Sequence, residues 1–190
     1  ILVIDEQHKF GVHQRILLNE KVGKECDTLL MTATPIPRTL ELAAYGDMDI
    51  SKLVTMPLSR KPIVTKSMST EKISDLKSAL LKKIENNEKI YWVCPLVEES
   101  NSSSIQSVTN RLQDLQEHYG NDKVSMVHGK MKNEEKNLIM ENFKTGKIKI
   151  LIATSVIEVG IDDPDATVII IENSERFGLS QLHQLRGRVG

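Results

Sequence analysis

The amino-acid sequence predicts an α/β protein built on parallel sheets, and three observations support this. Short apolar runs alternate with amphipathic helical patterns along the 190 residues, which is the order of βαβ units. The first run, Ile1–Ile4, leads directly into Asp5 and Glu6, and ligands of open α/β sheets bind at this end of a strand. Residues 55–62 show neither strand-like nor helical periodicity. We interpret this segment as a break between two α/β domains in tandem.

The individual elements follow in chain order. Strand-like runs occupy Ile1–Ile4, Thr28–Thr32, Ile63–Ser67, Lys89–Cys94, Lys123–Val127, Ile148–Thr154 and Ala166–Ile171. Apolar residues spaced three and four apart predict two intervening helices. Their apolar faces are Ile73, Leu76, Leu80 and Ile84, and Ile105, Val108, Leu112, Leu115 and Tyr119. Thr70 and Asn133 are predicted to cap the starts of helices, and Gly120 and Gly146 to follow their ends.

The domain boundaries are placed by residues 55–62. Pro57 and Pro62 bar this segment from a central strand, so we interpret it as a linker. Residues 1–54 hold two strands, too few for a complete domain, and are expected to be the C-terminal part of a first domain. Residues 63–190 are expected to form most of a second. The chain starts inside a strand-like run, which suggests a piece of a longer protein.

Composition excludes several classes of protein. Hydrophobic residues make up 39% and charged residues 27% of the chain, without an apolar run long enough to cross a bilayer. Cys26 and Cys94 form no C-x-x-C pattern, so neither a disulfide framework nor a zinc site is indicated, and we expect a soluble cytoplasmic protein. The net charge of −1 argues that any nucleic-acid binding is local.

The first motif is Asp5-Glu6-Gln7-His8. Its two carboxylates can have separate roles: Asp5 can hold Mg²⁺, and Glu6 can orient and deprotonate an attacking water. The alternative is an acidic turn at the end of a strand, and four residues alone do not decide between the two readings.

The second motif, residues 32–38, follows the second strand and reads Thr-Ala-Thr-Pro-Ile-Pro-Arg. The hydroxyl groups of Thr32 and Thr34 can hydrogen-bond the acidic strand end. The segment can equally be a strand-to-helix turn with Thr34 as the N-cap, and both readings can hold together.

Two further motifs lie in the second part of the chain. In residues 153–162, small side chains and Gly160 allow backbone amides to approach a phosphate, although a tight βα loop explains them too. In residues 184–190, Arg186 and Arg188 stand beside glycines, which suits bidentate phosphate recognition. A solvated basic face is the alternative for this last run.

The four segments resemble, in sequence order, the second, third, fifth and sixth motifs of superfamily-two helicases. Residues 5–12, 45–49, 93–100 and 175–190 are most similar to the bacterial ATP-dependent helicases of this family that remodel branched DNA. The resemblance implies two RecA-like domains of the P-loop NTPase fold, with ATP between them. Forked or branched DNA would be the partner, in fork regression, Holliday-junction processing, recombination and repair. A monomeric bacterial protein without membrane contact is expected.

The resemblance also implies roles for individual residues. Asp5 would bind Mg²⁺, Glu6 would be the catalytic base, and Gln184 and Arg188 would reach the γ-phosphate of ATP. Further nucleotide contacts would come from Gly160, Asp162 and Arg186. Residues that couple the nucleotide to DNA would be Gln7, His8, Thr32 and Thr34. Nucleic-acid contacts would come from Arg38, His128, Gly129, Thr154 and Ser155.

The sequence departs from the family pattern in one important respect. The phosphate-binding loop G-x-x-x-x-G-K-[ST] does not occur in the chain, so we do not expect the chain alone to hydrolyse ATP. Three alternatives stay open at this point: a transcription-repair coupling factor, a non-hydrolytic DNA-binding or scaffolding module, and a metal nuclease. Further carboxylates placed to complete a two-metal nuclease site are not apparent.

Overall fold

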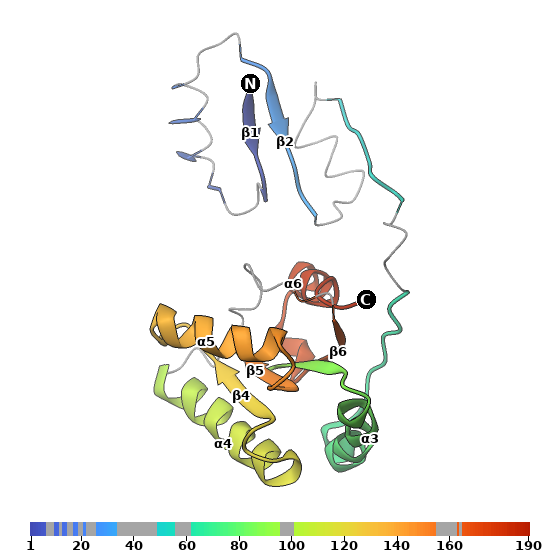
Figure 1. The fold of residues 1–190 in the computed structure, drawn as a ribbon. Coiled ribbons are helices and arrows are strands. Elements are labelled where there is room, and N and C mark those ends of the chain that lie inside the picture. Colours follow the sequence, from blue (N-terminus) through green and yellow to red (C-terminus); the bar gives the residue numbers. More distant parts are fainter. Residues whose placement is uncertain are drawn as a thin grey trace. The chain divides into compact units, whose positions relative to one another are not determined.

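The computed structural model describes most of the chain and divides it into two compact units, Ile1–Val54 and Thr55–Gly190. The described residues are 1–6, 10, 11, 13, 14, 17, 18, 21, 26–33, 49–55, 62–95, 101–154, 163 and 165–190, with the side chains of 101–107 excluded. Each unit is described by itself (Figure 1).

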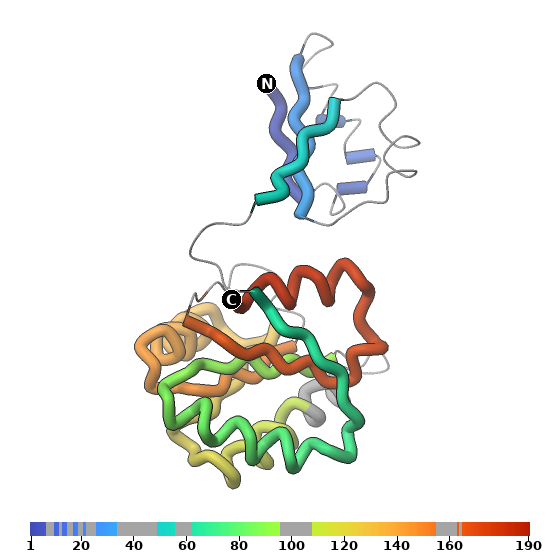
Figure 2. Tube along the Cα trace, turned by 90° about the vertical axis from the view of Figure 1, so that its right-hand side faces the viewer, coloured from blue at the N-terminus to red at the C-terminus, as the bar shows by residue number. Residues whose placement is uncertain are grey.

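The first unit contains two short parallel strands, β1 (Leu2–Ile4) and β2 (Thr28–Leu30). They lie side by side in Figure 2. The backbone N–H of Leu2 donates to the carbonyl of Asp27 and that of Met31 donates to the carbonyl of Ile4, both at 2.8 Å. Both strands therefore end at the same edge of this small sheet.

The second unit is a four-stranded parallel sheet between two layers of helices. Its strands are β3 (Lys89–Val93), β4 (Val124–Val127), β5 (Ile150–Ala153) and β6 (Ala166–Ile171), in the order β4-β5-β3-β6. Its helices are α3 (Ile73–Glu85), α4 (Asn101–Tyr119), α5 (Asn133–Lys144) and α6 (Leu179–Arg186), with 3-10 turns η2 (Thr70–Lys72) and η4 (Ser174–Arg176). The predicted α/β class with parallel sheets is confirmed.

Two apolar cores fill the faces of this sheet, because successive strand residues point to opposite sides. On β3, Ile90 and Trp92 pack with α3 and α4, whereas Tyr91 and Val93 pack with α5 and α6. All four side chains are fully buried. Figure 1 shows α3 and α4 on one side of the strands and α5 and α6 on the other. The carboxyl ends of the four parallel strands therefore lie along one edge of the sheet, between the two helix layers.

The predicted helix faces are confirmed where side chains are described. Leu80 and Ile84 of α3 are buried in the same core as Val108 and Leu115 of α4. Gly120 follows α4 with a φ of +102°, and Gly146 follows α5 with a φ of +76°. Both helices therefore end where glycine accepts a left-handed backbone.

Two sets of predictions are wrong. Residues 63–67 form no strand: Val64 is 79% exposed, and its neighbours Thr65, Lys66 and Ser67 are exposed too. A segment with one apolar anchor, here the partly buried Ile63, buries too little surface to join a parallel sheet. The second unit accordingly shows four strands in its described residues, not five.

The helix starts are each displaced by one residue. Ser69, not Thr70, caps η2, and its hydroxyl accepts from the backbone N–H of Glu71 at 3.4 Å. Asn133 is the first residue of α5, and the capping position is taken by Lys132 without a side-chain cap. A hydroxyl caps only from the residue with extended backbone, and propensity alone does not identify that residue.

Candidate functional site

The carboxyl ends of β1 and β2 bring two of the predicted motifs together. Because Ile4 pairs with Leu30 in the parallel register, Asp5 and Glu6 leave β1 at the same edge where β2 leads into Thr32. Asp5 and Thr32 are exposed, and Glu6 is half-buried. Two carboxylates and a hydroxyl thus converge on one end of the sheet.

The backbone of Glu6 is unusual. Its φ is +47°, in the left-handed region that costs a non-glycine residue about 1–2 kcal/mol. The turn is held by the side chain before it, since Asp5 Oδ1 accepts from the Glu6 backbone N–H at 2.8 Å. Backbone strain of this kind is often found at functional sites.

Other predicted residues lie outside the described part of the chain. They are Gln7, His8, Thr34, Arg38, Ser155, Gly160 and Asp162.

A second row of strand ends lies in the second unit. The residues that directly follow β3, β5 and β6 are Cys94, Thr154 and Glu172. The backbone N–H of Cys94 donates to the carbonyl of Ala153, and that of Glu172 to the carbonyl of Val93, both at 2.9 Å. Thr154 is only 3% exposed, so the end of the sheet fixes the position of its hydroxyl group.

His128 and Gly129 extend this row. Val127 pairs with Ala153, so β4 delivers His128 next to the strand end that delivers Thr154. Two of the residues predicted to contact nucleic acid are thus neighbours. The turn after His128 is closed by α5, because Lys136 Nζ donates to the Gly129 carbonyl at 3.1 Å; sequence reasoning missed this lysine.

The predicted phosphate-binding residues lie on or just after α6. Leu185 and Val189 are buried, at 0% and 5% exposure, and anchor the helix end to the core. Gln184 lies on α6 and Arg188 follows its end by two residues, and both are half-buried. Arg186 is exposed, and its Nη2 donates to the carbonyl of Ile63 at 3.4 Å. Of the three predicted residues, Arg186 is thus held against the backbone at Ile63.

Sequence reasoning also missed a charged network at Glu172. Its Oε1 accepts from Trp92 Nε1 and lies against Arg111 Nε, both at 2.5 Å, and Arg111 Nη2 donates to Oε2 at 3.2 Å. Arg111 also contacts the indole face of Trp92, 5.6 Å from its centroid, and Asp114 at 2.6 Å. Glu172 directly follows a strand, and this position in the sequence is the feature by which it could have been identified as a candidate.

Burial and this network together shift the pKa values of nearby groups. Burial, and secondarily the negative charge of Glu172, raise the pKa of the Cys94 thiol to about 12, against the opposing effect of Arg111. Burial alone would lower the pKa of Arg111, but Glu172 and Asp114 raise it above its ordinary value. Cys94 is therefore an un-ionised thiol at neutral pH, unsuited to nucleophilic chemistry.

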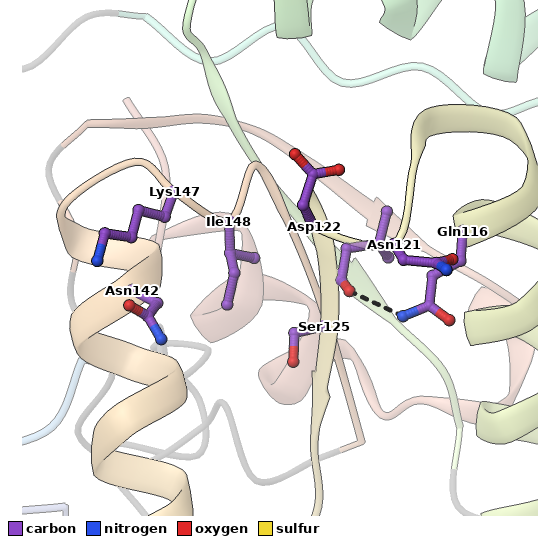
Figure 3. Close-up of a pocket in the computed structure, with 8 residues that line it drawn as sticks. Gln116, Asn121, Asp122, Ser125, Asn142, Lys147 and Ile148 are labelled. Atoms are coloured by element: carbon purple, nitrogen blue, oxygen red, sulfur yellow. Dashed lines mark hydrogen bonds between the residues drawn. The ribbon is translucent and has the colours of Figure 1, made fainter.

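A polar hollow of about 650 Å³ lies elsewhere, near the amino ends of β4 and β5 (Figure 3). Gln116 Nε2 donates to the Val124 carbonyl at 3.1 Å on its wall. Its lining residues are Gln116, Asn121, Asp122, Val124, Ser125, Asn142, Lys147 and Ile148. None of them belongs to a predicted motif, and the hollow lies at the opposite end of the strands from Thr154.

Two further findings concern the described residues only. They include no group of three or more His, Cys, Asp or Glu side chains placed to hold a metal ion. No helix among them has the length and apolar character that spanning a membrane requires.

Comparison with known proteins shows the family of the chain and supports its fold. The model of the helicase conserved C-terminal domain matches residues 71–190. The ATP-dependent DNA helicase RecG of Streptococcus pneumoniae is 49% identical over the whole chain, and that of Pasteurella multocida 47%. A solved structure of RecG bound to a three-way DNA junction matches 99% of this chain with a TM-score of 0.70 and 40% identity. The predicted resemblance is confirmed.

The matches differ in how much they cover and in what they support. The chain spans 28% of the length of each of these two curated relatives and 24% of the solved RecG chain. A structure of yeast Dbp5 bound to RNA and ADP BeF3 covers 99% of the chain with a TM-score of 0.59, but at 14% identity it supports the fold alone.

Proposed function

The chain belongs to the helicase conserved C-terminal domain family, and from this premise we propose that it is part of an ATP-dependent DNA helicase that remodels branched DNA. The proposed tasks are fork regression and Holliday-junction processing in recombination and repair. Support comes from the 49% identity to a RecG helicase along the entire chain. The matched RecG structure, which holds a three-way DNA junction, supports branched DNA as the partner.

The observation that carries the proposal is the position of the motifs at strand ends. Asp5 and Glu6 leave β1 in a strained turn beside Thr32, and Thr154 leaves β5 beside His128. Ligands of open α/β sheets bind outside these carboxyl ends. Both units therefore present their motif residues where a ligand of this fold would bind.

We propose that the nucleotide is handled by a small set of side chains. Glu6 would accept the proton of the attacking water, and Gln184 and Arg188 would contact the γ-phosphate. An arginine in that role stabilises the charge that develops on the transferred phosphoryl group. Gly160, Asp162 and Arg186 would be further nucleotide contacts.

Asp5 suits the magnesium ion that such chemistry uses. Its carboxylate is exposed at the strand end, with Oδ1 accepting one backbone hydrogen bond. Mg²⁺ is usually bound by one or two carboxylates together with phosphates and waters, so one well-placed aspartate fits. When bound, the ion would neutralise charge on the phosphates.

The DNA-facing role is proposed for the neighbouring His128, Gly129 and Thr154. Threonine hydroxyl groups and backbone N–H groups commonly contact nucleic-acid phosphates. Ser155 and Arg38 are proposed as further nucleic-acid contacts. Gln7, His8, Thr32 and Thr34 are proposed to couple DNA binding to the nucleotide.

The test is the Glu6→Gln variant of a complete helicase that contains this chain. The amide keeps the shape of the side chain but cannot accept a proton, so fork-stimulated ATP turnover should fall by about 10²–10⁴-fold, while ATP affinity stays nearly unchanged. Phosphate release and equilibrium binding of a fluorescent ATP analogue measure the two quantities.

Asp27→Asn is the matched control, because Asp27 is an exposed carboxylate of the same unit at the other end of β2. It should leave both quantities unchanged. Equal losses of affinity and turnover in Glu6→Gln would make Glu6 a structural or metal-binding residue. A wild-type protein without fork-stimulated turnover would favour the non-hydrolytic module instead.

A further inference from the structure

The polar hollow of Figure 3 lies along the outer edge of the second unit's sheet. β4 is the outermost strand in the order β4-β5-β3-β6, and within the described part of the chain no strand pairs with its outer side. Figure 3 shows Ser125 on this strand, between Gln116 of α4 and Asn142 of α5. The hollow is therefore a groove with strand backbone along its base and a helix on each side.

Alternate residues of β4 direct their backbone groups into this groove. The Lys123 carbonyl accepts a backbone N–H of β5 at 3.0 Å, and in a parallel pair every second residue bonds the same neighbouring strand. Ser125 and Val127 therefore bond β5. Val124 and Met126 direct their N–H and C=O groups away from β5, toward the groove.

One of these outward groups already has a side-chain partner. Gln116 Nε2 donates to the Val124 carbonyl at 3.1 Å, in the way that a neighbouring peptide N–H would. Among the described residues, no side chain bonds the outward backbone groups of Met126. An exposed strand edge is a template for pairing with another chain, and here that template is only partly covered.

The charges around the groove indicate which kind of segment would pair there. Lys147 lines it, Lys123 directly precedes β4, and Lys144 is the last residue of α5. All three are exposed, and none forms an ion pair with another described residue. Asp122 is the one carboxylate in the lining. Positive charge therefore prevails, which favours an acidic segment.

Lysines beside an edge strand can also serve to discourage pairing between sheets, and the shape of the groove bears on this alternative. The helices on its two sides obstruct a second sheet but leave room for a single extended chain. The volume of about 650 Å³ lies within the range of about 300–1,000 Å³ that is usual for ligand-binding clefts. The groove is thus shaped for one strand.

We propose that this groove binds an extended acidic segment of another polypeptide, which adds to the sheet beside β4 as a further strand. Its backbone would pair with Met126 and replace Gln116 at the Val124 carbonyl. Its acidic side chains would face the three lysines. The inference uses none of the residues to which the proposed function assigns nucleotide or DNA.

The first experiment measures binding of a fluorescent octapeptide of alternating valine and glutamate to the 190-residue chain. Fluorescence anisotropy should show saturable binding. The affinity should fall at least tenfold when Lys123, Lys144 and Lys147 are all replaced by glutamate. It should fall equally in the wild type when lysine replaces each glutamate of the peptide, or when proline, which cannot donate to a strand ladder, replaces two of its valines.

The matched control replaces three other lysines by glutamate, at Lys66, Lys72 and Lys82. These residues are exposed, lie in or before α3, and line no part of the groove. The change in net charge is the same, so the control should bind the acidic peptide as the wild type does. If the groove variant does not fold, the same three lysines are replaced by glutamine and read by the same criteria.

The second experiment tests the mode of binding by amide exchange, followed by NMR with and without the acidic peptide. Strand addition should slow exchange at Val124 and Met126 at least tenfold, because their N–H groups point toward the groove. Exchange at Ser125 and Val127, which already bond β5, should change little. Uniform slowing at all four residues, or none, would contradict strand addition.

Four binding results would overturn the proposal. The first is no saturable binding of the acidic peptide up to about 1 mM, the weak end of the affinity scale. The second is equal affinity for the acidic, basic and proline-containing peptides. The third is a groove variant that loses affinity for a single-stranded oligonucleotide but not for the peptide, which would make the lysines a nucleic-acid contact. The fourth is binding to this chain but not to the complete helicase, which would show that the same protein covers this edge.

Discussion

At the scale of single residues, two carboxylates that follow parallel strands have different surroundings. Glu6 follows β1 in a strained, half-buried turn. Glu172 follows β6, and both of its oxygens are engaged by Arg111, one of them also by Trp92. A carboxylate that is paired in this way has a structural role, and Glu172 is therefore assigned to the packing of β6 against α4.

Arg188 gives a prediction at this scale. Replacing it by lysine in the complete helicase keeps the charge but removes the planar fork that grips two phosphate oxygens. ATP turnover should fall by about 10³-fold or more, the range of an arginine finger, whereas fork affinity should change little. Steady-state ATPase and fork-binding titrations are the measurements.

Arg176→Lys is the control for this substitution, since Arg176 is an exposed arginine of the neighbouring η4 turn. If turnover in Arg188→Lys equals that of Arg176→Lys, or only fork binding suffers, Arg188 contacts DNA or solvent instead of phosphate.

At the scale of elements, polar contacts join helices whose apolar faces were predictable. Lys77 of α3 and Arg111 of α4 share Asp114, each at 2.6 Å. The Tyr119 hydroxyl donates to the Lys77 carbonyl at 2.7 Å. Helical periodicity predicts which faces become buried, but these contacts depend on how α3 and α4 lie against each other.

Asp114 makes the stability of this helix pair depend on pH. Burial would raise the pKa of its carboxyl group, but hydrogen bonds from Lys77 and Arg111 lower it below the ordinary value. The unfolded chain therefore takes up this proton first on acidification. The stabilisation, up to about 1 kcal/mol for a partly exposed pair, is present at neutral pH and is lost as pH falls below about 4.

Urea unfolding of the wild type and Asp114→Asn between pH 7 and pH 3 checks this. Their difference in stability should be greatest at neutral pH and shrink in acid. Asp75→Asn, at an exposed position in the first turn of α3, is the comparison. A difference that stays constant over the whole range would contradict the assigned ion pairs.

The end of α5 gives a second prediction at this scale. Gly146 has a φ of +76°, and a Cβ there would lie 3.2 Å from Nζ of Lys149, the far end of a flexible side chain that donates to Asn87 Oδ1 at 3.0 Å. Backbone strain therefore limits substitution more than crowding does. Gly146→Ala should destabilise the chain by about 1 kcal/mol, and Gly146→Asn by less, because asparagine tolerates this conformation. Thermal or urea unfolding measures both, and an equal effect of the two variants would point to packing instead.

At the scale of the whole molecule, the buried core is distributed unequally. Both apolar clusters belong entirely to the second unit. Among its described residues, the first unit shows two strands of three residues each, and an isolated two-stranded sheet is marginal in water. The second unit should therefore contribute a large share of the folding free energy of the chain.

A chain of residues 55–190 should fold by itself. Trp92, the single tryptophan of the chain, is buried in this unit and reports on its core. We expect a cooperative urea transition in Trp92 fluorescence with a midpoint close to that of the 190-residue chain. A truncated chain without near-UV circular dichroism would show that residues 1–54 are needed for this core.

The sequence by itself determined the features that depend on local order along the chain. The alternation of strands and helices, the apolar faces of α3 and α4 and the glycines after α4 and α5 were all readable from residue spacing and type. The candidate motifs were readable too, because parallel strands deliver their following residues to one edge. Residues 63–67 were misread because their apolar character is local, whereas joining a sheet requires a partner strand.

Only the tertiary structure decided which charged groups meet. Lys89 and Asp163 are 74 residues apart in sequence, and Arg111 and Glu172 are 61 apart. No periodicity links such residues, since their contact depends on the strand order β4-β5-β3-β6 and on how the helices pack over it. The same packing brought Glu172 against Arg111 and Trp92. Position in the sequence selects candidates, and the surrounding charges and burial decide what each can do.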